Sequence, residues 1–305
     1  MNVPSWIRRR FGYGPAILAA ALVLATPPAL SAEPAGFTPH PAGPHHAPSA
    51  TPASARLRAA GAPMIVFAHR GASSAAPENT LVSDEVARRG GAKWIENDVQ
   101  PSKDGVPYIL HDATVDRTTD GTGTLRSLTS AQVDALDAGS WFAPVFAGTR
   151  IPTLAAQLAD LRTRGGNLLL EIKGRQTEAE VARIVREVRD QDMTGRVFVQ
   201  SFDVVSLQRV YAQAPELPLG LLRDNLDPDP VAISRDLHLS AYNVADKGLS
   251  VRPAAVDELH EAGVAVNVWT VDSAARWKAL DELGVDGVIT NRPTELTGWI
   301  AGRQA

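Results

Sequence analysis

The sequence predicts an α/β fold, a TIM (β/α)8 barrel with a small inserted segment after a β-hairpin. From Met64 onward, short apolar runs rich in β-branched residues alternate with amphipathic segments of helical period. Eight such runs occur in about 240 residues, and no glycine-rich dinucleotide fingerprint follows the first of them. This pattern favours a closed barrel over an open doubly wound sheet.

Local signals place the individual elements. One helix is expected over residues 80–90, and another opens with a capping box formed by Thr177 and Glu180. A third is expected to open at Pro253 and to end at Gly263. The expected strands are 65–68, 94–99, 168–172, 197–201, 217–222, 241–244, 264–271 and 287–290.

One segment interrupts the alternation. Residues 106–111 read as an extra strand, joined to the second strand by a turn at 102–105, which makes a hairpin. An insertion of about 113–150 follows, with a short helix expected over 129–136 and an aromatic cluster of Trp141, Phe142 and Phe146. We expect this insertion to pack over one edge of the site.

Residues 1–32 have the order of a secretory signal peptide. A basic stretch, Arg8-Arg9-Arg10, precedes an apolar run that is too short to span a bilayer, and small residues follow. Arg8-Arg9 also fits a twin-arginine signal, so the Sec and twin-arginine routes are both open. Residues 33–60, rich in Pro, Ala, Ser and His, are expected to form a flexible linker before a barrel domain at 61–305. A secreted or periplasmic protein without a stable membrane span in its mature form is expected.

Composition excludes several classes of protein. The chain has 305 residues, of which 44% are hydrophobic and 21% charged, enough for a sizeable core. Its net charge of −4 becomes −7 when the three arginines of residues 1–32 are removed, which argues against a nucleic-acid partner. There is no cysteine, so disulfides, thiolate metal sites and a cysteine nucleophile are excluded.

Two histidines stand where expected strands end. His69-Arg70-Gly71 ends the first strand, at the barrel end where TIM-barrel active sites lie. His69 suits an acid/base role and Arg70 suits pairing with a phosphate, although a hydrogen-bonded strand-end pair is the alternative. His111-Asp112 closes the hairpin strand and supplies a second histidine. One base and one acid are what phosphodiester cleavage requires.

Three carboxylates recur on neighbouring strands. Glu96 and Asp98 are two residues apart on the second strand, so both side chains point to the same face. Glu171 ends the next parallel strand, and Lys173 follows it on the same face. Like charges that converge are costly unless a cation lies between them, and an oxygen-rich set suits one divalent cation, Ca²⁺ or Mg²⁺. The alternative is a salt-bridge cluster with Arg70 and Lys173.

The chain from about residue 65 to 300 resembles the glycerophosphodiester phosphodiesterases. The motifs that carry the resemblance are His69-Arg70-Gly71, Pro77-Glu78-Asn79-Thr80, Glu96-Asn97-Asp98, Lys103-Asp104-Gly105, His111-Asp112, Arg117-Thr118-Thr119, Gly121-Thr122-Gly123, Ile151-Pro152-Thr153-Leu154, Glu171-Ile172-Lys173, Trp269-Thr270-Val271 and the stretch 284–293.

The resemblance implies a barrel with a small insertion and hydrolysis of glycerophosphodiesters to glycerol 3-phosphate and an alcohol. It also implies roles for individual positions: catalysis by His69 and His111, a cation on Glu96, Asp98 and Glu171, and substrate contacts from Arg70, Lys173 and Trp269. Two positions depart from the family's pattern. Asn97 stands where a small or apolar residue is commoner, and Asn291 where an aspartate is often found.

Other functions stay open from the sequence. A barrel phosphodiesterase that acts on membrane lipids is one rival, although the acidic mature charge does not favour it. A binding protein that captures glycerophosphodiesters is a second, although a binder has no need of a proton-transfer pair. Glu78 can lie at the mouth of the barrel or help to fix the start of a helix. The oligomeric state and the order of proton transfer are not determined by the sequence.

Overall fold

The computed structural model describes residues 57–59 and 61–304. The expected signal peptide, 1–32, and the expected linker, 33–60, except for residues 57–59, lie outside the described residues. Arg58, near the end of the expected linker, forms an ion pair with Asp281, and its backbone N–H donates to Asp286 Oδ1 at 2.5 Å. Contacts with the barrel therefore begin before residue 61.

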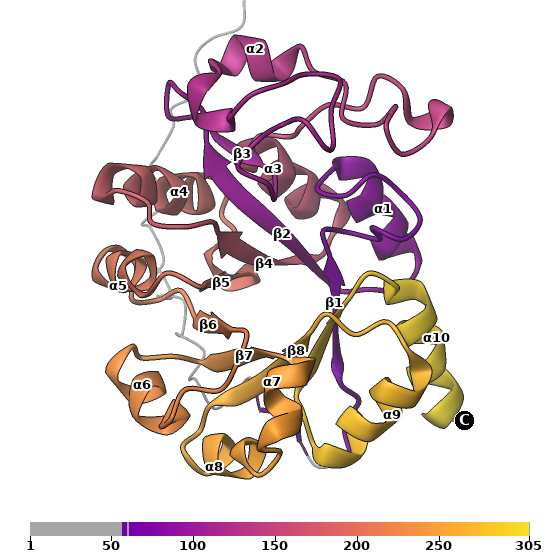
Figure 1. Cartoon of the computed structure of the whole chain (residues 1–305), viewed down its shortest axis with the longest axis vertical. Coiled ribbons are helices and arrows are strands. Elements are labelled where there is room, and N and C mark those ends of the chain that lie inside the picture. The colour runs from indigo at the N-terminus through magenta and orange to yellow at the C-terminus, as the bar shows by residue number, and fades with distance from the viewer. Residues whose placement is uncertain (1–56, 60, 305) are drawn as a thin grey trace, which may run out of the picture. The chain divides into compact units, whose positions relative to one another are not determined.

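In the described part of the chain, eight parallel strands close into a barrel, as the sequence predicts (Figure 1). The sheet runs in the order β1-β9-β8-β7-β6-β5-β4-β2, and pairing of β1 with β2 closes it. The strands are β1 (Ile65–His69), β2 (Trp94–Pro101), β4 (Asn167–Ile172), β5 (Val197–Ser201), β6 (Leu219–Arg223), β7 (Ala241–Ala245), β8 (Ala265–Trp269) and β9 (Gly287–Thr290).

Helices cover the outside of the barrel (Figure 1). Their apolar faces and the outer faces of the strands form one large buried core, which includes Val185 of α4 and Leu170 of β4. These helices are α1 (Leu81–Arg89), α3 (Leu154–Arg164), α4 (Glu178–Asp190), α5 (Val204–Gln213), α6 (Pro230–Asp236), α7 (Asp246–Val251), α8 (Ala255–Glu261), α9 (Ala274–Leu283) and α10 (Pro293–Gln304). Among the described residues, we find no helix with the length and apolar character needed to cross a membrane.

The predicted hairpin and insertion are present. β3 (Pro107–Ile109) pairs antiparallel with β2, and the insertion contains α2 (Ser130–Asp134) and two short 3-10 helices, η2 (Leu125–Ser127) and η3 (Pro144–Phe146). Tyr108 of β3 and Val115, Leu125 and Val133 of the insertion belong to a small core that the hairpin and the insertion share. The aromatic cluster forms as predicted, since Phe142 makes edge contacts with Trp141 and Phe146.

Element ends differ from the prediction by a few residues. β6 begins at Leu219 rather than at 217, because Pro218 has no N–H to donate to a strand ladder. The helix expected from Pro253 to Gly263 is shorter, Ala255–Glu261, and Gly263 follows it at φ +76°. The capping box predicted at Thr177 and Glu180 is present at the start of α4.

Apolar and polar side chains fill the barrel interior in separate groups. Phe67, Leu169, Phe198 and Ile289 belong to an apolar cluster inside the strands. Buried amide side chains, described below, lie beside it. Glycine leaves room for them: a Cβ at Gly220 would lie 2.6 Å from Asn243 Nδ2, and a Cβ at Gly287 would lie 2.5 Å from Asn267 Oδ1.

Candidate active site

A cavity of about 160 Å³ lies at the carboxyl ends of the barrel strands. This is the end of the fold where TIM-barrel active sites are found. Its lining includes residues from β1, β2, β4, β5 and β8, so side chains far apart in the sequence meet there. Most of the residues expected from the sequence line it: His69, Arg70, Glu96, His111, Glu171, Lys173 and Trp269.

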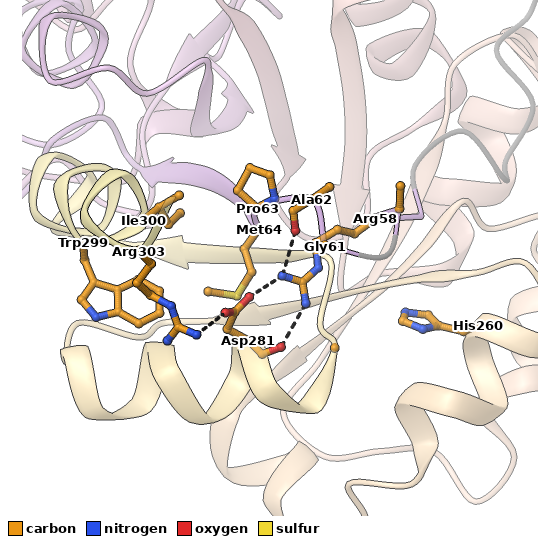
Figure 2. A pocket seen from close by; sticks show the side chains of 12 residues that line it. Arg58, Gly61, Ala62, Pro63, Met64, His260, Asp281, Trp299, Ile300 and Arg303 are labelled. Carbon is orange, nitrogen blue, oxygen red and sulfur yellow. Dashed lines mark hydrogen bonds and ion pairs between the residues drawn. The ribbon is translucent and has the colours of Figure 1, made fainter. Parts of the chain in front are cut away.

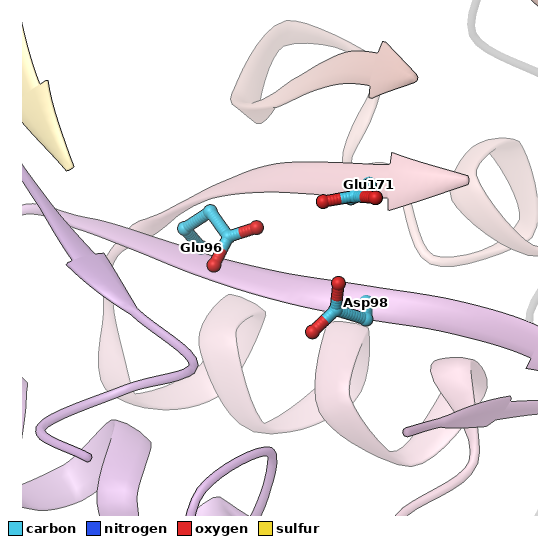
Figure 3. Close-up of side chains that lie close together, drawn as sticks. All are labelled: Glu96, Asp98 and Glu171. Atoms are coloured by element: carbon cyan, nitrogen blue, oxygen red, sulfur yellow. The ribbon is translucent and has the colours of Figure 1, made fainter. Parts of the chain in front are cut away.

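The three expected metal ligands converge. Figure 3 shows Glu96 and Asp98 on β2 and Glu171 on the neighbouring strand β4, with their carboxylates close together. One oxygen of each lies within 4.8 Å of the others, and all three residues are buried. Asn97 points to the opposite face, as alternation along a strand requires, and its amide donates to Asp84 Oδ1 at 2.9 Å.

The electrostatics of these carboxylates fit a site for a cation. Burial, followed by the charges of Asp98 and Glu171, raises the pKa of Glu96 well above its usual value. Burial and the charge of Asp98 raise the pKa of Glu171 to about 7. Burial would also raise the pKa of Asp98, but the charges of Lys173, His111 and Arg70 lower it. The positive charge of a divalent ion would stabilise all three in their ionised forms.

His69 is held by an amide rather than by a carboxylate. Its Nδ1 lies 2.7 Å from Asn291 Oδ1, and Asn291 Nδ2 donates to Asp272 Oδ2 at 2.7 Å. Because Asp272 needs a donor, the amide must direct its oxygen to His69, so Nδ1 carries the proton and Nε2 is left free. Burial and the charge of Arg70 lower the pKa of His69 to about 4. A neutral imidazole at neutral pH follows.

His111 has a different partner. Its Nδ1 lies 2.7 Å from Asp112 Oδ1. Asp112 also accepts from Arg117 Nε at 2.7 Å, and these hydrogen bonds from Arg117 lower the pKa of Asp112. A carboxylate therefore lies directly behind the His111 ring, where His69 has a neutral amide. The two histidines therefore stand in environments of different charge.

Two positively charged side chains, Lys173 and Arg70, lie beside the carboxylates. Lys173 Nζ is 2.7 Å from Glu171 Oε1 and 3.5 Å from Asp98 Oδ1. Arg70 Nε is 3.6 Å from Asp98 Oδ2, and Arg70 Nη1 donates to Glu78 Oε1 at 2.8 Å. Glu78 thus lies at the barrel mouth, the first of its two expected positions, while Thr80 caps α1. The structure contains both the ion pairs of the salt-bridge alternative and the convergent carboxylates of a metal site.

Trp269 forms the apolar side of the cavity with Phe202. Their rings meet edge to face at 5.5 Å, and Trp269 Nε1 donates to the carbonyl oxygen of Asn243 at 3.0 Å. Phe202 is 38% exposed, which is unusual for a large apolar side chain in this fold. The cavity therefore has one charged side and one aromatic side.

A row of buried amides supports Glu96 from inside the barrel. Gln200 Nε2 donates to Glu96 Oε1 at 3.1 Å, Asn243 donates to Gln200 at 2.8 Å, and Asn267 donates to Asn243 at 2.9 Å. Sequence reasoning missed these residues and Asp272. The signal for the amides was available, because polar residues inside otherwise apolar strands need a partner.

A larger cavity of about 510 Å³ lies at the opposite, amino-terminal ends of the strands (Figure 2). Its charged groups are paired with neighbouring side chains: Asp281 pairs with both Arg58 and Arg303, and His260 Nε2 lies 2.8 Å from Asp286 Oδ2. It contains no residue of the convergent set described above. The amino-terminal end of a TIM barrel is more often associated with stability than with catalysis.

Comparison with known proteins points to one family. The model of the glycerophosphoryl diester phosphodiesterase family matches residues 69–295. A glycerophosphodiester phosphodiesterase of Caldanaerobacter subterraneus is 35% identical, with coverage of 76% of this chain and 96% of the relative. One from Bacillus subtilis is 32% identical, with coverage of 75% and 84%.

Solved structures give the same result. A glycerophosphodiester phosphodiesterase from Agrobacterium tumefaciens is 32% identical, with a TM-score of 0.70 and coverage of 77% of this chain and 99% of that one. An Oleispira antarctica phosphodiesterase in complex with the product sn-glycerol-3-phosphate is 30% identical, with a TM-score of 0.74 and coverage of 78% and 97%.

Proposed function

The chain belongs to the glycerophosphoryl diester phosphodiesterase family, and we propose that it hydrolyses glycerophosphodiesters to glycerol 3-phosphate and an alcohol. The observation that carries this proposal is that two histidines line one cavity together with Glu96 and Glu171, which converge with Asp98 in a group of three buried carboxylates. The product named for the Oleispira antarctica structure supports the choice of substrate.

We propose that Glu96, Asp98 and Glu171 hold one divalent cation, Ca²⁺ or Mg²⁺. All the donors are carboxylate oxygens, which hard divalent ions prefer. Burial and the neighbouring carboxylates raise the pKa values of Glu96 and Glu171, and a bound cation would offset this cost of ionisation. The cation, when bound, would stabilise negative charge that develops on the phosphoryl oxygens.

Arg70 and Lys173 are proposed to bind the phosphodiester. Both side chains line the cavity and already pair with carboxylates around the metal site. A cation on those carboxylates would weaken these pairs, because it competes for the same negative charge. The guanidinium and ammonium groups could then donate to phosphate oxygens.

The partners of the two histidines support an assignment of their roles. We propose that His69 is the base, because its Nδ1 is committed to Asn291 and its free Nε2 can accept a proton from the attacking oxygen. That oxygen belongs either to water or to the glycerol 2-hydroxyl. His111 is the proposed acid that protonates the leaving alkoxide, because the other histidine is assigned as the base and the Asp112 carboxylate at Nδ1 orients the ring with Nε2 available.

The size of the cavity favours a small substrate. A volume of about 160 Å³ is below the roughly 300–1,000 Å³ that is usual for larger ligands. The glycerophosphate part would occupy the cavity, with its carbon atoms against Trp269 and Phe202. The head group would extend toward solvent.

The test is hydrolysis of glycerophosphocholine, lysophosphatidylcholine and phosphatidylcholine by the purified protein with Mg²⁺ or Ca²⁺. We expect stoichiometric glycerol 3-phosphate and choline from the first substrate and little turnover of the two lipids. Release of phosphocholine instead would place the cleaved bond on the other side of the phosphorus. Preference for the lipids would favour the membrane-lipid alternative.

A further inference from the structure

The insertion contributes one arginine to the edge of the active site. Arg117 contacts two carboxylates that come from different parts of the chain. Its Nε and Nη2 donate to Asp112 Oδ2 and Oδ1 at 2.7 and 3.1 Å, and its Nη1 and Nη2 donate to Glu78 Oε2 and Oε1 at 2.8 and 2.8 Å. All three of its nitrogens are therefore used.

Each of these carboxylates also holds a residue of the site. Asp112 Oδ1 lies 2.7 Å from His111 Nδ1, and Glu78 Oε1 accepts from Arg70 Nη1 at 2.8 Å. Arg117 is thus connected to His111 through Asp112, and to Arg70 through Glu78. Charges alternate along the path from Asp112 through Arg117 and Glu78 to Arg70.

We propose that Arg117 is a positioning residue for the reaction. It fixes Asp112 behind His111 and weakens the ion pair between Glu78 and Arg70. This inference rests on the proposed function, since it concerns the same site. It gives the insertion a role in catalysis: the segment packs with the β2–β3 hairpin around a small separate core and places one guanidinium at the barrel mouth.

The geometry differs from that of an ordinary surface ion pair. Exposed pairs contribute little because long side chains must be ordered to form them. Here the Arg117 guanidinium contacts two carboxylates at once, and the Glu78 side chain is only 12% exposed. Although burial would raise the pKa of Glu78, hydrogen bonds from Arg117 and the charge of Arg70 lower it.

Loss of Arg117 should affect substrate binding through Glu78. Glu78 and Asp112 both accept from Arg117 Nη2, so without the guanidinium two negative groups face each other. Glu78 would then bind Arg70 more firmly and compete with the phosphodiester for it. A higher KM follows.

Loss of Arg117 should affect turnover through Asp112. The Asp112 side chain is 30% exposed. Among the described residues, its charged or titratable partners are His111 and Arg117. When Asp112 is free to rotate, the His111 ring loses its fixed orientation. A lower kcat follows, since small misplacements of catalytic groups are costly.

The experiment compares Arg117→Ala with Arg126→Ala in steady-state hydrolysis of glycerophosphocholine. Arg126 is a matched control because it lies in the same insertion, is 48% exposed against 45% for Arg117, and pairs with Glu180 of α4 away from the site. We expect kcat/KM of Arg117→Ala to fall by about 10–100-fold, through both kcat and KM, and that of Arg126→Ala to stay within about twofold of the wild type. Thermal unfolding should be similar for the two variants.

Two further measurements separate positioning from a structural effect. Free guanidinium, at concentrations far below those that unfold proteins, should restore activity to Arg117→Ala, because the side chain is accessible to solvent. Adding Glu78→Gln to Arg117→Ala should lower the raised KM. If Arg117→Ala behaves as Arg126→Ala does, or if guanidinium restores nothing, the inference is overturned. An inactive wild type would instead overturn the proposed function.

Discussion

Asp84 provides a test of the electrostatics around β2, the strand that carries Glu96 and Asp98. It is a fully buried residue of α1, and its carboxylate accepts from Asn97 Nδ2 at 2.9 Å and from Gln157 Nε2 at 2.9 Å. Burial, despite these hydrogen bonds, raises its pKa from 3.8 to about 7. The oxygens Asn97 Oδ1 and Gln157 Oε1 are buried without a hydrogen-bond partner among the described residues, so a protonated Asp84 has acceptors nearby.

The sign and size of the effect follow from proton linkage. A carboxyl group with a higher pKa in the folded state binds a proton more tightly there than in the unfolded chain. Its contribution to stability is therefore present at about pH 4 and is lost as the pH rises to about 7. A shift of about 3 units corresponds to at most about 4 kcal/mol of unfolding free energy. Asp84→Asn should remove this dependence, because an amide cannot ionise and can donate to the unpaired oxygens.

The assay is urea unfolding of wild type and Asp84→Asn at intervals from pH 4 to 8. We expect the variant to gain stability relative to the wild type as the pH rises, with most of the gain between pH 5 and 7 and a plateau above. Asp236→Asn carries the same chemical change at an exposed position and should show no such trend. A difference between Asp84→Asn and wild type that is constant with pH would refute the reasoning.

Further predictions concern catalysis and export. His69→Ala and His111→Ala should each lower kcat by about 10²–10⁴-fold with unfolding temperatures near that of the wild type, and near-normal rates in either variant would contradict the paired-histidine mechanism. Asn291→Leu should lower kcat by about 10-fold or more with a smaller change in KM, because Nδ1 of His69 loses its acceptor, and an unchanged kcat would show that Asn291 does not orient the ring. We propose that residues 1–32 direct export, so the protein expressed in its host should be recovered without them outside the cytoplasm, and retention of the uncleaved protein in the cytoplasm would contradict this.

The strands were predictable because each is a short run of residues that the barrel buries. Their ends were less so, as β6 shows: the apolar run begins at Leu217, but Pro218 cannot donate to the ladder. The insertion was recognised because it breaks the alternation. Which part of the insertion reaches the site was not predictable. The aromatic cluster is not among the residues that line the cavity, and the contact with the edge of the site is made by Arg117 instead.

Residues at strand ends were predictable as site residues, because charged groups after apolar runs must meet at one end of a barrel. Supporting residues were not, since their roles depend on contacts across the sequence. Asp272 reaches His69 only through Asn291, and Arg117 reaches Arg70 only through Glu78, 39 residues away in the chain. Asn291 stands where the family often has an aspartate, and its role depends on Asp272, which accepts from its amide and so directs its oxygen to His69.

Hydrolysis by this protein should depend on a cation held by Glu96, Asp98 and Glu171. The most direct test is the rate of glycerol 3-phosphate release from glycerophosphocholine after EDTA treatment and dialysis, followed by titration with Mg²⁺ or Ca²⁺. We expect activity to be lost with EDTA and to return along a saturable curve, with Glu171→Gln requiring at least about tenfold more cation. Full activity in the presence of excess EDTA would contradict the claim.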